Sequence, residues 1–310
     1  MAFLPRFNRL TGLNWQRHLP REPWSHAELL RQETDIGSLL AGSRSVCIGK
    51  IGTTELCGLE YFDRWIRLPW PRSASWHRPA QRLHHTAGLF PIRKDVFFRW
   101  ATEYRESIAF LDVTAQWQDP KDHLGAYENV FLAKNLPSVR RVYLAALRVR
   151  FVSWLPQLCS RRWLVISPFR RTIESQLPHL NRLDLYRNVE PSVVDRAAAN
   201  CQILACPQLA YMVPPVHRDW HEGLADLKRQ MEATDFEVAV IGAGAWSIPL
   251  AAHAKKMGKI GLHLGGDTQL LFGIKGGRWR DIKDFNDFWV HPLVGDRPEN
   301  FRLMEGGAYW

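Results

Sequence analysis

Short apolar runs alternate with stretches of helical periodicity along most of the chain. The apolar runs predict strands at 45–52, 162–169, 201–207, 236–244 and 259–266. Apolar residues that recur every three or four positions predict helices at 54–66, 94–111, 172–181, 217–232 and 247–258. The stretch 139–147 fits either a strand or a helix, and 69–85, rich in proline, tryptophan and histidine, predicts a loop. This alternation favours an α/β sandwich with a mostly parallel sheet flanked by helices.

The composition narrows the class of protein. A chain of 310 residues, 46% hydrophobic and 23% charged, can bury a sizeable core. No run reaches the roughly 20 apolar residues of a membrane span, and the first residues lack the apolar block of a signal peptide. The five cysteines are scattered without a Cys-x-x-Cys pair, which argues against a disulfide scaffold or a zinc knuckle. We therefore expect a cytoplasmic protein.

The net charge of +10 suits partners that carry phosphate or other negative groups. The basic residues are dispersed and form none of the usual nucleic-acid-binding motifs, so nucleic acid is not the expected partner. Residues 1–40 predict a basic, aromatic N-terminal extension, and 41–310 a single α/β domain. The arginines and tryptophans of that extension suit peripheral contact with an anionic membrane at its inner face.

A glycine turn follows the clearest predicted strand. Gly242, Ala243 and Gly244 lie just before a helix, where small residues let backbone amides approach a phosphate and the helix dipole favours an anion. A dinucleotide fingerprint would need a further glycine, but Ser247 stands there, and no acidic residue closes the next strand. On the phosphate interpretation, valine at Gly244 blocks nucleotide binding and leaves the fold largely intact.

A second turn, at residues 263–269, gathers polar groups at a strand end. His263, Asp267 and Gln269 surround Gly265 and Gly266 and suit contact with a metal, a ribose or an acceptor hydroxyl. The alternative is a buried, hydrogen-bonded histidine followed by an aspartate that caps a turn.

Other candidates lie close to predicted strand ends. The candidate phosphate-binding cations are Lys50, Arg170, Arg171 and Lys275. Trp246 suits either stacking on a nucleobase or packing of its helix against the sheet.

Five segments together resemble a group of bacterial proteins from polysaccharide gene clusters, which in turn look like the GT-D fold glycosyltransferases. The segments are IGAGAWSIPLAAHAKKMGKIGLHLGGDTQLLFGIKGGRW (241–279), VCIGKIGTTELCGLEYF (46–62), HTAGLFP (85–91), SPFRRTIESQ (167–176) and EGGAYW (305–310). The resemblance implies a Rossmann-like sandwich, a nucleotide-sugar donor, a glycan or lipid-linked acceptor, and a divalent metal, Mn²⁺ or Mg²⁺. It also implies an Asp-x-Glu motif after the first strand.

The resemblance and the chemistry of the residues together select the candidate site. Glu55, His263 and Asp267 are the candidate catalytic groups, with Glu55 or His263 as the base and Glu55 and Asp267 as metal ligands. The candidate nucleotide-binding residues are Gly52, Thr53, Ser167, Arg170, Gly242, Ala243, Gly244, Trp246, Gly265, Gly266 and Gln269.

One position departs from the family pattern. Thr53 stands where the family has its aspartate, and a hydroxyl does not supply the charge of a carboxylate. Glu55 then works with diphosphate oxygens and water, or Asp267 adds a second carboxylate, or metal is dispensable. If Glu55 is only a first-turn helix acid, it has no such role. The expected function is glycosyl transfer; a Rossmann-like oxidoreductase and a non-catalytic ligand-binding relative are the alternatives.

Overall fold

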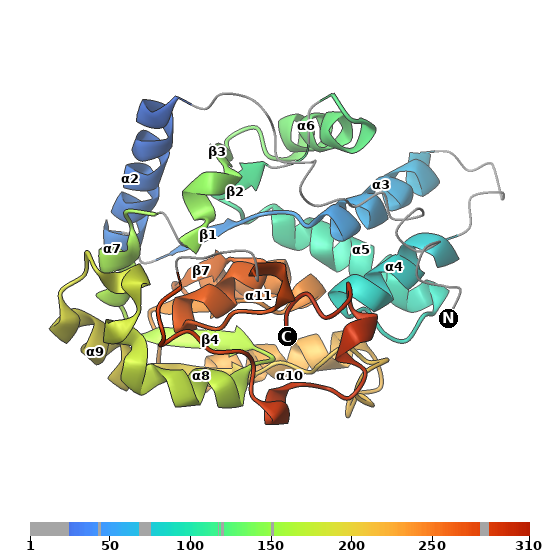
Figure 1. The fold of residues 1–310 in the computed structure, drawn as a ribbon. Helices are drawn as coiled ribbons and strands as arrows, with labels where there is room; N and C mark the ends of the chain where they lie inside the picture. Colours follow the sequence, from blue (N-terminus) through green and yellow to red (C-terminus); the bar gives the residue numbers. More distant parts are fainter. Residues whose placement is uncertain are drawn as a thin grey trace.

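The computed structural model describes residues 25–42, 45–67, 76–116, 118, 121–149, 152–279 and 285–310. Its centre is a seven-stranded sheet in the order β3-β2-β1-β7-β6-β4-β5 (Figure 1). All the strand pairs are parallel. The strands are β1 (Val46–Gly49), β2 (Val113–Gln116), β3 (Arg140–Tyr143), β4 (Trp163–Ser167), β5 (Gln202–Ala205), β6 (Val238–Ile241) and β7 (Ile260–His263).

Helices cover both faces of this sheet, as predicted for a Rossmann-like sandwich. Alternate strand residues enter opposite cores, so Val46 and Ile48 lie in one core and Cys47 lies in the other. The first core is covered by α2 (His26–Gly42), α7 (Leu155–Cys159), α8 (Arg170–Gln176) and α9 (Pro191–Ala199). The second is covered by α3 (Thr53–Arg67), α4 (His77–Ala87), α5 (Lys94–Ile108), α6 (His123–Asn135), α10 (Trp220–Glu232) and α11 (Ser247–Lys256).

Most of the predicted elements appear close to their expected positions, and a few predictions were wrong. The ambiguous stretch 139–147 is a strand followed by a 3₁₀ turn, Leu144–Leu147. Part of the expected loop 69–85 is helix α4, in which Ala80 and Leu83 are fully buried. The pattern gave no prediction for β2 or for the helices α2, α6, α7 and α9.

Helix α2 belongs to the packed part of the chain. Ile36 and Leu40 are fully buried, and α2 lies against α7 (Figure 1). The backbone N–H of Tyr143 donates to the side-chain oxygen of Gln32, 2.7 Å away. The expected domain boundary at residue 40 therefore falls inside this helix.

The N-terminal stretch that suggested membrane contact, residues 1–24, lies outside the described residues. Among the residues that the structure describes, no helix is long and apolar enough to cross a membrane. Membrane contact therefore stays a prediction from the sequence alone.

Helix α11 lies very close to β7 and β1. A methyl group at Gly261 would lie 2.6 Å from Cα of Ala251, and one at Gly49 would lie 3.2 Å from Cδ1 of Ile248. Glycine at these two positions permits the close approach. This packing places the turn before α11 at the carboxyl ends of the central strands.

Glu128 of α6 gives the fold a measurable pH dependence. Its side chain is 1% exposed, and burial raises its pKa from 4.5 to about 8, while the charge of Arg141 opposes the rise. Below pH 4.5 both folded and unfolded chains hold the proton; between pH 4.5 and 8 only the folded chain holds it. Stability is therefore full at low pH and falls as pH rises towards 8, by on the order of a few kcal/mol.

Urea titrations from pH 5 to 9 measure this loss. We expect Glu128→Gln to flatten the decline relative to the wild type, whereas glutamine at the exposed Glu106 of α5 leaves it unchanged. Equal pH slopes for Glu128→Gln and the wild type would contradict the assignment.

Candidate functional site

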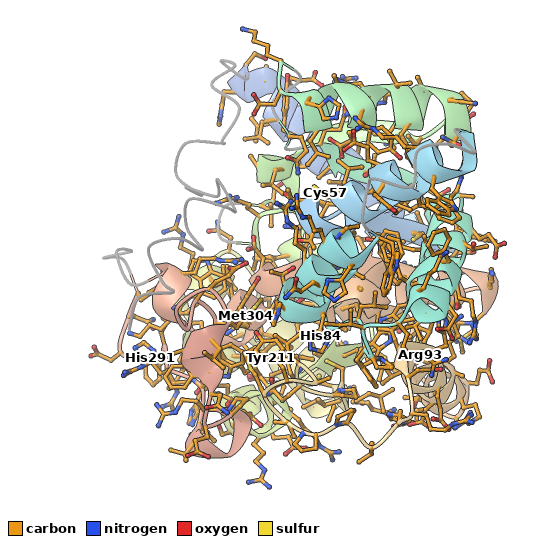
Figure 2. All side chains as sticks on the ribbon, turned by 90° about the vertical axis from the view of Figure 1, so that its right-hand side faces the viewer. Cys57, His84, Arg93, Tyr211, His291 and Met304 are labelled. Atoms are coloured by element: carbon orange, nitrogen blue, oxygen red, sulfur yellow. The ribbon has the colours of Figure 1, made fainter. Side chains whose placement is uncertain are left out.

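A cavity of about 610 Å³ lies at the carboxyl ends of the strands. Ligand sites of parallel α/β proteins form at this edge because the loops that follow the strands converge there. Figure 2 faces the side of the molecule on which α3 and α4 lie, and labels Met304, a residue of the cavity wall. The segments that follow β1 to β7 each line the cavity, through Lys50, Gln118, Arg148, Pro168, Cys206, Gly242 and Gly265 respectively.

The cavity brings together every predicted site residue except Arg170, Arg171 and Lys275. Besides Lys50, three of these residues follow β1, one ends β4, four follow β6, and five lie at the end of β7 or after it. In that order they are Gly52, Thr53 and Glu55; Ser167; Gly242, Ala243, Gly244 and Trp246; and His263, Gly265, Gly266, Asp267 and Gln269.

Glu55 lies in the first turn of α3 with 9% of its surface exposed. Its carboxyl group folds back over Gly52, where a methyl group would lie 2.8 Å from Cδ of Glu55. Burial raises the pKa of Glu55; a hydrogen bond from its own backbone N–H and the charge of Lys50 oppose the rise. Glu55 therefore gains and loses its proton at a higher pH than an ordinary glutamate.

Lys50 directly follows β1 and reaches the turn after β7. Its Nζ lies 3.8 Å, and its Cε 3.4 Å, from the position of a methyl group built on Gly265. Burial lowers the pKa of Lys50, and the charges of Asp267 and Glu55 oppose this. The ammonium group therefore interacts with both carboxylates that the sequence proposed as metal ligands.

His263 ends β7 and is 7% exposed. Its Nδ1–H donates to the carbonyl oxygen of Ile241 at 3.3 Å. Burial, together with the charge of Lys50, lowers its pKa to about 3. His263 is therefore neutral at neutral pH and too weakly basic for efficient proton abstraction. The alternative interpretation, a buried and hydrogen-bonded histidine, fits this geometry.

Two basic residues in the cavity wall, Arg148 and Arg278, were not predicted from the sequence as site residues. The guanidinium of Arg278 lies 4.3 Å from the ring centroid of Tyr309, and Nη2 of Arg278 lies 2.7 Å from Oε2 of Glu305. The motifs KGGRW and EGGAYW were both visible in the sequence. Their pairing was not visible, because it depends on how the C-terminal segment folds back.

The other predicted cations lie outside the cavity wall, which corrects their expected role. Arg170 is 54% exposed at its side chain and pairs with Glu174, with Nε and Oε1 2.7 Å apart. Lys275 lies over the ring of Phe285, 5.8 Å from its centroid. Arg171 packs beside Gly295, where a methyl group would lie 2.8 Å from its Cδ. Each of these three side chains thus contacts a neighbour outside the cavity: Glu174, Phe285 and Gly295 respectively.

Trp246 packs its helix against the protein, which is one of the two interpretations that the sequence left open. Its ring is 3% exposed and stacks on Trp220 with the centroids 6.3 Å apart. Its indole N–H donates to the carbonyl oxygen of Trp220 at 3.0 Å. Both the face and the polar atom are therefore engaged within the core.

The glycine turn before α11 is packed from both sides. Gly244 has a φ of +55°, and a methyl group there would lie 2.5 Å from the carbonyl oxygen of Ala87. The N–H of Gly242 donates to Ile166, and that of Ala243 donates to the hydroxyl of Ser247. Valine at Gly244 is therefore expected to disturb the fold, contrary to the prediction from the sequence, because the backbone of Ala87 fills the space that its side chain would need.

Two buried polar atoms among the described residues of the cavity wall have no hydrogen-bond partner. They are Oγ1 of Thr268 and Oε1 of Gln269. The amide nitrogen of Gln269 donates to the carbonyl oxygen of Tyr309 at 3.0 Å, which fixes its orientation. Thr268 and Gln269 therefore each keep a polar oxygen without a protein partner in this part of the wall.

Comparison of the chain with protein-family models, curated proteins and solved structures finds no match in any of the three. Within the described residues, no group of three or more His, Cys, Asp or Glu side chains is arranged to hold a metal ion.

Proposed function

We propose that this chain is a glycosyltransferase that moves a sugar from a nucleotide-sugar donor to a glycan or lipid-linked acceptor. The observation that carries the proposal is the cavity at the carboxyl edge of the sheet. It combines the carboxyl groups of Glu55 and Asp267 with three basic side chains, Lys50, Arg148 and Arg278. The GT-D-like motifs of the sequence contribute to the walls of this same cavity.

Glycosyl transfer requires groups of these kinds. The leaving nucleoside diphosphate gains negative charge, which preorganised cations stabilise. The acceptor hydroxyl loses a proton to a base, and Glu55 suits this role because burial raises its pKa towards neutrality. A cavity of about 610 Å³ falls in the size range of pockets that enclose small ligands and cofactors.

A donor panel tests the proposal. We expect the full chain to bind one nucleoside diphosphate and to hydrolyse slowly, or transfer from, the matching nucleotide sugar. Preferential binding of NAD would favour an oxidoreductase. If the chain binds the nucleotide but neither hydrolyses nor transfers from any donor of the panel, with any candidate acceptor, the result would favour a non-catalytic ligand-binding protein.

Arg148 and Arg170 provide a matched pair of variants for the same assay. Arg148→Gln removes a cation from the cavity wall and is expected to reduce donor turnover about tenfold or more. Arg170→Gln removes a similar charge that pairs with Glu174 outside the cavity, and turnover should stay at the wild-type level. Equal losses in both variants would show that net charge, and not this cavity, governs turnover.

A further inference from the structure

The residues present do not fit the divalent metal that the family resemblance implies. Mg²⁺ and Mn²⁺ prefer clusters of oxygen ligands that include carboxylates. Thr53, at the position of the family aspartate, offers a hydroxyl that already accepts a hydrogen bond from Nε2 of Gln118 at 2.8 Å. The predicted metal ligands are the two carboxyl groups of Glu55 and Asp267; the other carboxyl groups in the cavity wall belong to Asp122 and to Glu305, which pairs with Arg278.

A basic side chain accompanies those two carboxyl groups. Lys50 lies over Gly265, two residues before Asp267, and its charge interacts with both Asp267 and Glu55. A divalent cation placed between the carboxylates would experience repulsion from this ammonium group. Lys50 therefore already supplies the positive charge that balances these two carboxylates.

We infer that this cavity binds the diphosphate of its donor without a divalent metal, and that the ammonium group of Lys50 supplies the positive charge instead. The inference rests on the proposed function for the identity of the ligand. It concerns the means by which the phosphates are held.

The geometry of the turn after β7 supports a phosphate position beside Lys50. Lys50 approaches Gly265, and Nη1 of Arg278 would lie 3.2 Å from a methyl group built on Gly266. The ring of Tyr309 also lies over Gly266, with its Cε1 2.7 Å from the same methyl position, so the turn after β7 lies between Lys50 on one side and Arg278 with Tyr309 on the other. Arg148 adds a third basic group, and its charge is close enough to act on that of Lys50. Lysine binds phosphate as a compact point charge and arginine as a planar fork, so the set suits a diphosphate.

Calorimetric titration of the full-length wild type with UDP, repeated with the other nucleoside diphosphates, tests the inference. We expect dissociation constants within about twofold of one another in EDTA, in Mg²⁺ and in Mn²⁺. Binding that disappears in EDTA and returns with Mn²⁺ would overturn the inference. Absence of binding in all three conditions would overturn it as well.

Lys50→Met and Lys275→Met form the matched pair. In EDTA, Lys50→Met should weaken nucleotide binding about ten- to hundredfold, because a charge-assisted contact is lost. Lys275 lies outside the cavity wall, so Lys275→Met should bind as the wild type does. Wild-type affinity in Lys50→Met would contradict the inference. Lys50→Arg retains the charge and should keep most of the affinity, and if Lys50→Met fails to fold, the EDTA titration of the wild type still decides.

Failure of the inference and failure of the proposed function give different results. Metal-free binding without sugar transfer would leave the phosphate site in place and remove the enzymatic proposal. Sugar transfer that requires Mn²⁺ would keep the enzyme and remove the role of Lys50.

Discussion

Alanine in place of Gly244 is expected to destabilise the chain by about 3–5 kcal/mol, a large share of the stability of an ordinary domain. Two costs add at this position. The φ of +55° is a conformation that residues with a Cβ rarely adopt, and the new methyl group would meet the carbonyl oxygen of Ala87 at 2.5 Å. Because that obstacle is backbone of α4, the helix and the turn before α11 must separate to accept it.

Gly258 separates the two costs. Its φ is +75°, but a methyl group there meets nothing within 4 Å. Gly258→Ala should therefore lose only the conformational part, about 1–2 kcal/mol. Urea unfolding of both variants beside the wild type measures the difference. If both substitutions lower the free energy of unfolding by the same amount, the contact of the new methyl group with Ala87 adds no cost of its own.

Five of the seven strands and half of the α-helices that the structure describes were predictable because their hydrophobic pattern is simple. In α10, Trp220, Leu224, Leu227 and Met231 recur at helical spacing, and all four are buried. The strands β4 and β6 are buried along their whole length, which produces the continuous apolar runs typical of central parallel strands.

The missed elements lack such a pattern. Strand β2 contains Thr114, a buried polar residue, and ends in Gln116. Helix α6 buries Glu128 on its inner face, so its apolar stripe is interrupted. Helix α4 has Pro79 in its first turn, a position that tolerates proline although proline usually indicates a loop.

The site was predictable as far as strand ends could indicate it. Glu55 and Asp267 both follow central strands, and the parallel sheet brings both to one cavity. The direction of a side chain at a strand end was not predictable. Arg170 opens α8, and Glu174 one turn later draws it outward. Arg278 reaches the cavity from a segment without a preceding strand, so no local pattern indicated it.

Glutamine in place of Glu55 is expected to lower the rate of sugar transfer by about 10²–10⁴ while the affinity for the nucleotide changes little. The substitution keeps the size of the side chain and removes its ability to accept a proton. Since burial raises the pKa of Glu55, the basic form is lost at a higher pH than in an ordinary glutamate. The transfer rate of the wild type should therefore rise with pH through an inflection above 4.5, and the residual rate of Glu55→Gln should lack this inflection.

Glu60 is the matched control on the same helix. It pairs with Arg64, with Oε1 and Nη2 2.6 Å apart, and does not line the cavity, so Glu60→Gln should retain the wild-type rate and pH profile. Single-turnover measurements across pH 4–9, with nucleotide affinity determined in parallel, separate chemistry from binding. Wild-type turnover in Glu55→Gln would reduce Glu55 to a helix-terminal acid and leave Asp267 as the candidate base. A loss of affinity equal to the loss of rate would instead assign Glu55 to ligand binding, because general-base catalysis alone leaves the ground-state complex intact.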